Sequence, residues 1–217
     1  MKVKHISIAV DPEQTGNPVF GAPADLTAYI LEPVEGITDK KRPAVLLCPG
    51  GGYHKLSGRE DQPIAMKYLA AGFHVFVLHY SLMPDVFPRA LMELALSMKL
   101  IREHGNEWNV DVKRIAVSGF SAGGHLACCL GTFWNKEWLY KALEVKPEMI
   151  QPNGMILCYP VITSEEYCHK GSFECLMGTE ASKKDVELRR LLSLEYQVGP
   201  QVPKTFYGIP GRISQCQ

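Results

Sequence analysis

The sequence has no excess of either charge, because 23 Lys and Arg residues balance 23 Asp and Glu residues. A balanced chain offers little attraction to a phosphate backbone, so we expect no nucleic-acid partner. It also lacks a long apolar run. The longest run, residues 73–83, is interrupted by His74 and His79. It is far shorter than the about 20 residues that span a bilayer, so we expect no membrane partner either.

A signal peptide is also missing from the sequence. Residues 1–5 have no apolar core, which favours a cytoplasmic protein. The seven cysteines are odd in number and several lie in apolar runs, as is typical of a reduced chain. Cys158, Cys168, His169 and Cys175 do not have the spacing of a CxxC-type site, so we expect no metal ion.

No linker or internal repeat divides the chain, so residues 1–217 are predicted to form a single domain. The expected strands are residues 3–10, 26–31, 43–48, 73–79, 114–118 and 154–158, with a last one that begins at 204. The expected helices are 61–71, 88–104, 121–133 and 182–194. This alternation predicts an α/β fold with a mainly parallel sheet. Residues 160–196 are more polar and predict a cap-like insertion over the carboxyl edge of the sheet.

The strongest local signal is the G-x-S-x-G pattern of residues 119–123. A nucleophilic serine needs a sharp turn between a strand and a helix, and small residues on either side allow that turn. Ser121 has an expected strand before it and an expected helix after it. The alternative interpretation is a Gly/Ser turn that merely starts a helix.

A run of glycines, residues 50–52, follows the strand 43–48 directly. Backbone N–H groups in such a run can approach a substrate and stabilise the negative charge that develops in acyl transfer. The N–H of Ala122, directly after the serine, is the other candidate donor. The alternative is an ordinary turn between a strand and a helix.

Several segments together make the sequence similar to the α/β-hydrolase superfamily, and in particular to its small bacterial acetyl esterases and acetylxylan-esterase-like carboxylesterases. They are Cys48-Pro49-Gly50-Gly51-Gly52-Tyr53, Leu56-Ser57 with Arg59-Glu60, residues 119–127, Cys158-Tyr159-Pro160-Val161-Ile162, residues 169–173 and Leu192-Ser193-Leu194-Glu195. The resemblance covers about residues 40–206 and implies a three-layer α/β-hydrolase fold.

The resemblance also implies a function. Ser121 would be the nucleophile of a serine carboxylic-ester hydrolase, and Gly51, Gly52 and Ala122 would form the oxyanion hole. The substrate would be a small-molecule ester with a short acyl group, with acetyl esters of sugars or small alcohols favoured. No cofactor is implied. Tyr53 and His54 are candidates to line the pocket.

The sequence departs from the family at the catalytic base. The family order is Ser, then Asp or Glu, then His. After Ser121 the chain offers only Asp185 and, besides His125, only His169, in the reverse order and within the insertion. His125 lies one turn after Ser121 on an apolar helix and is interpreted as structural. We therefore find no complete Ser-Asp-His triad in these 217 residues.

The C-terminal residues suggest a reason. Family members continue from the strand P-x-T-F with L-W-H-T, and then with an acidic residue before V-P. This chain has Pro203-Lys204-Thr205-Phe206 followed by residues 207–217, which do not match. If the codons that these residues allow are read in a frame shifted one base earlier, they can encode the residues that the family has at these positions. We expect a chain truncated or frameshifted after Phe206, lacking the last strand and helix with the triad Asp and His.

A truncation would affect both the function and the edge of the sheet. The alternative function is a catalytically impaired remnant of an esterase. The strand that begins at residue 204 would become the edge of the sheet, and residues 208–217 would pack poorly. An exposed edge would also permit a homo-oligomer through strand pairing.

Overall fold

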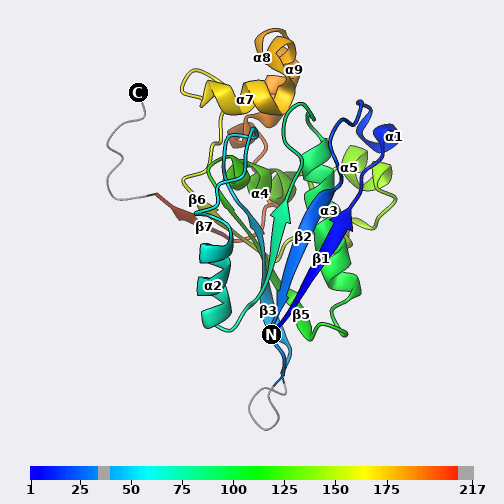
Figure 1. Ribbon diagram of the computed structural model, residues 1–217. Coiled ribbons are helices and arrows are strands. Elements are labelled where there is room, and N and C mark those ends of the chain that lie inside the picture. Colours follow the sequence, from blue (N-terminus) through cyan, green and yellow to red (C-terminus); the bar gives the residue numbers. More distant parts are fainter. Residues whose placement is uncertain (34–39, 210–217) are drawn as a thin grey trace.

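The computed structural model describes residues 1–33 and 40–209, and a seven-stranded sheet forms its centre (Figure 1). The strand order is β1-β2-β4-β3-β5-β6-β7. β2 is antiparallel to β1 and β4, and the other neighbouring pairs are parallel, which confirms the predicted fold class. The strands are β1 (Lys2–Ile8), β2 (Ala24–Ile30), β3 (Arg42–Cys48), β4 (His74–His79), β5 (Val110–Phe120), β6 (Gly154–Cys158) and β7 (Thr205–Gly208).

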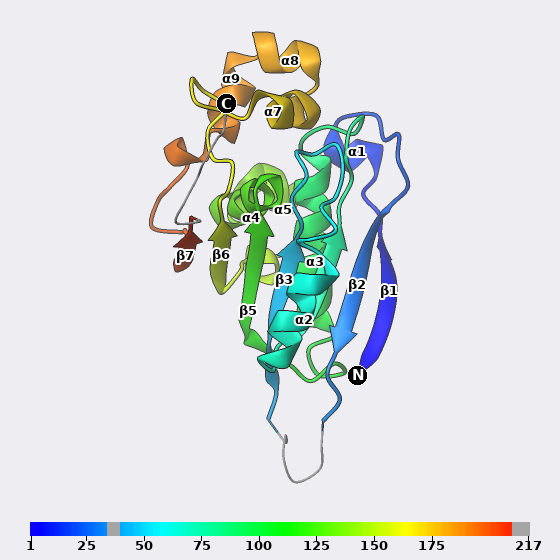
Figure 2. The same ribbon diagram turned by 60° about the vertical axis from the view of Figure 1, so that its left-hand side comes forward.

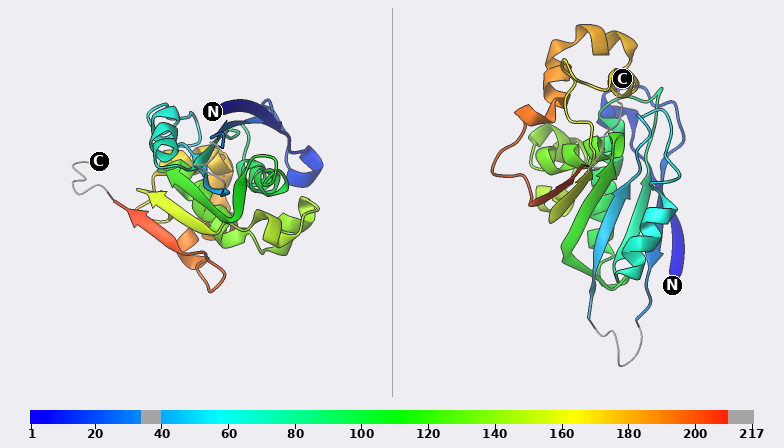
Figure 3. Two further views of the ribbon diagram at one scale, coloured as in Figure 1. Left: turned by 90° about the horizontal axis from the view of Figure 1, so that it is seen from below. Right: turned by 90° about the vertical axis from the view of Figure 1, so that its left-hand side faces the viewer.

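Helices cover both faces of the sheet (Figure 2). α2 (Gln62–Ala70) packs on one face through Ala65 and Leu69. α3 (Arg89–Glu103) and α4 (Ala122–Phe133) belong to the larger core on the other face. The sheet therefore lies between two helical layers, as the end-on view shows (Figure 3).

The inner strands are buried on both faces. Residues 44–48 of β3 and 75–78 of β4 have no exposed surface. A parallel strand that is covered on both sides needs a continuous apolar run, which explains why these strands were predictable from sequence. β5 begins at Val110 rather than at residue 114, because Val110 pairs with Arg42 below the apolar part of the strand.

Residues 160–196 lie beyond the carboxyl ends of the parallel strands, above α4 (Figure 1). The single helix expected at 182–194 is wrong. Asp185 separates two helices, and its carboxylate accepts the N–H of Leu188 at 2.8 Å as the N-cap of the second one. This segment comprises α7 (Lys170–Met177), α8 (Thr179–Lys184), α9 (Val186–Leu192) and the 3-10 turn η1 (Leu194–Tyr196).

The helix α7 was not predicted, and neither were three short helices elsewhere in the chain. They are α1 (Pro12–Thr15), α5 (Glu137–Ala142) and α6 (Pro147–Ile150). Each has only one or two turns, which is too short to show a helical period in the sequence.

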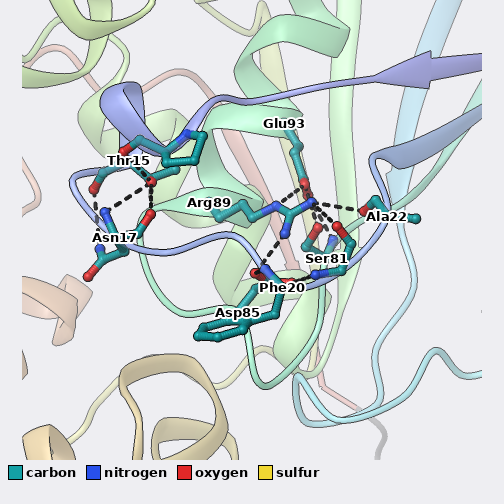
Figure 4. A network of polar contacts seen from close by, with 10 residues as sticks. Thr15, Asn17, Phe20, Ala22, Ser81, Asp85, Arg89 and Glu93 are labelled. Atoms are coloured by element: carbon teal, nitrogen blue, oxygen red, sulfur yellow. Dashed lines mark hydrogen bonds and ion pairs between the residues drawn. The ribbon is translucent and has the colours of Figure 1, made fainter.

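A buried ionic network fixes the N-terminal segment to α3 (Figure 4). Arg89 is 3% exposed, and its guanidinium contacts Asp85 at 2.6 Å and Glu93 at 3.1 Å. The same guanidinium donates to the carbonyls of Gly21 and Ala22, and the Asp85 carboxylate accepts two N–H groups of residues 20–21. Burial raises the pKa of Glu93, while Ser81 and Arg89 oppose that shift by hydrogen bonding.

β7 forms the edge of the sheet, as predicted, and pairs with β6. Its side chains are exposed on both faces, with Phe206 at 66% and Tyr207 at 52%. The predicted poor packing of residues 208–217 falls almost entirely on residues 210–217, which lie outside the described residues. Among the helices that the structure describes, none combines the length and the apolar character needed to cross a membrane.

Candidate active site

Ser121 occupies a sharp turn between β5 and α4. Its backbone has φ 52° and ψ −117°, a conformation that a residue with a side chain rarely adopts and that costs about 1–3 kcal/mol. Three backbone hydrogen bonds hold it there. The Ser121 N–H donates to the Cys158 carbonyl at 3.0 Å, and the Ser121 carbonyl accepts from the backbone N–H groups of Val161 at 3.1 Å and His125 at 3.0 Å. The predicted turn is therefore present, and the serine side chain is half-buried.

Close backbone approach explains the glycines of the G-x-S-x-G pattern. A Cβ on Gly119 would lie 2.0 Å from the carbonyl oxygen of Gly123. A Cβ on Gly123 would lie 2.2 Å from the carbonyl oxygen of Cys48, at the end of β3. No side chain fits at either position, so the pattern reflects the packing of the turn against β3.

The glycine run lies against the serine turn. A Cβ on Gly50 would lie 2.6 Å from the Phe120 carbonyl oxygen and 3.1 Å from the Ser121 Cβ. Gly51 has φ 129° and Gly52 has φ 69°, in the region that favours glycine. Within residues 1–33 and 40–209, the N–H groups of Gly51 and Gly52 donate to no acceptor. Neither N–H group is therefore occupied within the described residues.

Ala122 opens α4 directly after Ser121. The first N–H groups of a helix have no acceptor within the helix, and they carry its partial positive charge. The Ala122 side chain is fully buried. The Ala122 N–H therefore lies at the positive end of α4.

Glu60 braces the glycine run from the side. One carboxylate oxygen accepts the Gly50 N–H at 2.8 Å, and the other accepts the Tyr159 hydroxyl at 2.8 Å. Partial burial and the neighbouring Glu60 raise the pKa of Tyr159, so this phenol stays protonated as the donor. Glu60 belongs to a segment that carried the family resemblance, but its contact with Gly50 was not predicted.

Tyr53 and His125 form a buried pair beneath the glycine run. The Tyr53 hydroxyl lies 2.9 Å from His125 Nδ1, and the Leu192 carbonyl oxygen lies 2.9 Å from Nε2. Since a carbonyl only accepts, Nε2 carries the proton and Nδ1 accepts from Tyr53. Burial lowers the pKa of His125 to about 4. His125 is structural, as predicted, whereas Tyr53 is 3% exposed and lies in the core rather than on a pocket wall.

His54 is exposed and lies next to Gly52, where a Cβ would be 3.1 Å from its Nδ1. The start of α7 reaches the same place. The Ser172 Oγ would lie 3.6 Å from that Cβ and is 2.8 Å from His169 Nδ1. Ser172 was not singled out from the sequence, because only the fold brings α7 to the glycine run.

A catalytic base for Ser121 would have to lie within hydrogen-bond distance of its hydroxyl. In the described part of the chain, no hydrogen bond joins the Ser121 hydroxyl to a histidine. Asp185 caps α9, and His169 bonds to Ser172. The structure therefore does not bring Asp185 and His169 together as a pair on Ser121.

Comparison with known proteins identifies the family. The sequence model of the BD-FAE family matches residues 33–162. The chain belongs to the BD-FAE family. Among curated relatives, endo-1,4-beta-xylanase B of Butyrivibrio fibrisolvens is 32% identical over 195 residues, which are 86% of this chain and 29% of that protein. The acetylxylan esterase of Xylanibacter ruminicola is 30% identical over 142 residues, which are 64% of this chain and 27% of that protein.

Solved structures place this BD-FAE chain among α/β-hydrolases. An acetyl ester-xyloside bifunctional hydrolase from Caldicellulosiruptor lactoaceticus has a TM-score of 0.77 and 30% identity, and the match covers 94% of this chain and 73% of that one. A carboxylesterase from Lactobacillus plantarum WCFS1 has a TM-score of 0.75 and 28% identity, with 96% and 72% covered. These relatives confirm the predicted superfamily, and they include proteins described as a carboxylesterase and as an acetyl ester-xyloside bifunctional hydrolase.

The BD-FAE match includes the glycine run and the Ser121 turn, while α7, α8 and α9 follow its last matched residue. The chain spans less than a third of the length of the two curated relatives named above.

Proposed function

We propose that this chain acts as a serine carboxylic-ester hydrolase with Ser121 as nucleophile. The main observation behind this proposal is that the strained Ser121 turn lies against the glycine run. In the described residues, the N–H groups of Gly51 and Gly52 have no acceptor. Strain of this kind is retained where a side chain must be presented to a reactant. Membership of the BD-FAE family supports the same assignment.

In the proposed reaction, Ser121 Oγ attacks the carbonyl carbon of the ester. The new C–O bond forms as the carbonyl electron pair moves to oxygen, and the N–H groups of Gly51, Gly52 and Ala122 stabilise that oxyanion. Collapse of this intermediate breaks the bond to the alcohol and leaves an acyl-serine. Water then attacks the acyl carbon, which releases the acid and restores Ser121. The Ser121 hydroxyl proton ends on the departing alkoxide, and a proton of the attacking water returns to Ser121 Oγ as the acyl bond breaks.

The proposed substrate is a short-acyl ester, with acetyl esters of sugars or small alcohols favoured. The choice of acetyl esters rests on the relatives, because they include an acetylxylan esterase and an acetyl ester-xyloside bifunctional hydrolase. A panel of aryl esters tests it. Activity should fall from acetate through butyrate to octanoate, and a preference for octanoate would overturn the short-acyl assignment.

A second candidate is a chain that binds esters with little turnover. It is favoured by the absence, among the described residues, of any histidine bonded to the Ser121 hydroxyl. An oxyanion hole without a base retains about 10³–10⁴-fold acceleration over water, far below a full triad.

A fluorophosphonate probe separates the two candidates. We expect slow, stoichiometric labelling and slow hydrolysis of an aryl acetate, both lost in Ser121→Ala and both kept in the control Ser7→Ala, at an exposed serine on β1. Rapid labelling would mean that a base activates Ser121 after all, and would discard the second candidate. Equal labelling and hydrolysis in Ser121→Ala would overturn the nucleophile itself.

We also propose that a second copy of this chain pairs along β7. The outer edge of β7 presents backbone groups that no strand of the described sheet occupies, and its Phe206 and Tyr207 side chains are exposed. Light scattering should show a concentration-dependent dimer. Tyr207→Pro should abolish it, since proline blocks a strand edge. A monomer at all concentrations would refute the pairing.

A further inference from the structure

A cavity of about 710 Å³ lies among α7, α8, α9 and the loop that precedes them. We call it the cap cavity. Its wall is formed by Ser164, Glu165, Glu166, Cys168, Lys170, Phe173, Glu174, Ser182, Lys183 and Arg189. Six of these ten side chains are charged, three of each sign. A cavity of this volume is in the range of small-molecule sites.

The cap cavity is distinct from the Ser121 site, because α7 separates the two. Lys170, Phe173 and Glu174 of α7 line the cap cavity. Ser172, on the other side of that helix, lies beside Gly52. The Phe173 ring rests on the His125 ring, with 5.3 Å between centroids, so α4 supports the floor of the cap cavity.

Arg189 is the residue that points to a ligand. Its Nε is buried and has no hydrogen-bond partner. Buried Nε or Nη atoms of Arg42, Arg89 and Arg102 also lack partners, but each of those guanidinium groups bonds elsewhere. Within the described residues, the Arg189 guanidinium makes no hydrogen bond or ion pair. The Nε is closed off from solvent, whereas the two Nη groups are accessible, so the Nη groups are the Arg189 donors that a ligand in the cap cavity can reach.

The remaining charges of the cap cavity are also unpaired. Among residues 1–33 and 40–209, the side chains of Glu165, Glu166, Glu174, Lys170 and Lys183 make no ion pair and no hydrogen bond. Neighbouring ionic residues on the same helices do pair, as Lys184 does with Glu180 at 2.6 Å. The wall of the cap cavity therefore carries both unpaired donors and unpaired acceptors.

We propose that the cap cavity binds a sugar that bears a carboxylate, a uronate. The Arg189 fork would receive the carboxylate, because a guanidinium matches a planar carboxylate with two parallel hydrogen bonds. Lys170 and Lys183 would add positive charge, and the glutamates would accept hydrogen bonds from the sugar hydroxyls. Three carboxylates in the wall repel a doubly charged phosphate, which favours the singly charged ligand.

Binding of D-glucuronate to the full chain tests the proposal by calorimetry, without any turnover at Ser121. We expect glucuronate to bind at least tenfold more tightly than D-glucose or inorganic phosphate. Arg189→Gln should weaken glucuronate binding at least tenfold. Arg190→Gln, the neighbouring arginine that stacks on Tyr196 instead of lining the cap cavity, should leave it unchanged.

No glucuronate binding, or equal binding in Arg189→Gln and wild type, would overturn the proposal. If Arg189→Gln fails to fold, Lys183→Glu on exposed α8 replaces it and should weaken glucuronate several-fold while leaving glucose unaffected. The methyl glycoside of glucuronate distinguishes two sources of the ligand. Binding as tight as that of the free sugar supports a uronate within a larger carbohydrate, and loss of binding supports a free uronate.

Discussion

Gly123→Ala is the sharpest test of how the Ser121 turn is built. The added Cβ would lie 2.2 Å from the Cys48 carbonyl oxygen and 2.4 Å from that of Pro49. It would be about 1.2 Å short of the 3.4 Å at which ordinary contact begins. Both neighbours are backbone atoms at the end of β3, so relief requires β3 and α4 to move apart.

The free energies can be compared directly. Overpacking of a tight core costs about 1–3 kcal/mol, and a rigid backbone neighbour places this site at the upper end. Alanine in place of glycine within a helix returns about 1 kcal/mol. The steric cost prevails, and we expect a net loss of about 2 kcal/mol in the free energy of unfolding. A displacement near 1 Å also slows a positioned reaction about 10²-fold, so fluorophosphonate labelling of Ser121 should slow accordingly.

Urea denaturation and the labelling rate measure the two effects. Gly58→Ala is the matched control, because a Cβ there meets nothing within 4 Å and its φ is ordinary. It should stay within about 0.5 kcal/mol of wild type and label at the wild-type rate. If Gly123→Ala matched Gly58→Ala in both measurements, the G-x-S-x-G spacing would not be set by contact with β3.

Three further predictions concern the supports of the site. Burial lowers the pKa of His125 from 6.5 to about 4 in the folded chain, so between these pH values the unfolded chain binds more protons. The free energy of unfolding should therefore fall as the pH drops from 6.5 to 4, by up to about 1.4 kcal/mol per pH unit. Urea denaturation should show this slope, and the same slope in His125→Gln would contradict the assignment to His125. Arg89→Met leaves two buried carboxylates without their cation and should cost about 3–5 kcal/mol in urea melts, whereas a loss below 1 kcal/mol would refute that role. Glu60→Ala removes the acceptor of the Gly50 N–H and should slow labelling of Ser121 about tenfold with a stability loss of about 1–3 kcal/mol, and unchanged labelling would show that this brace is dispensable.

The turn at Ser121 was predictable because its determinants are local. Two glycines, a buried strand and an apolar helix adjoin one another in the chain, and each follows from residue size and apolar pattern. The inner strands were predictable for the same reason. The break at Asp185 was missed although the signal was local, since aspartate favours an N-cap over a helix interior.

Contacts between distant segments were not predictable. Tyr53 looked like a pocket residue because it follows the glycine run, yet its hydroxyl bonds to His125 in the core. Ser172 lies beside Gly52 only because the α7 helix folds back over the glycine run. Such pairings depend on tertiary packing, for which a single sequence carries no periodic signal.

The buried imidazole of His125 joins three parts of the molecule. Its Nδ1 accepts from Tyr53, directly after the glycine run, and its Nε2–H donates to the Leu192 carbonyl at the end of α9. His125 itself belongs to α4. If the segment above α4 swung away on its own, the Nε2–H would lose its acceptor in an apolar interior, at a cost of about 1–3 kcal/mol. Opening of that segment is thus mechanically coupled to the loop that carries Gly51 and Gly52. Hydrogen exchange should report these regions as one cooperative unit, so any ligand held between α7 and α9 would alter the stiffness of the loop beside Ser121.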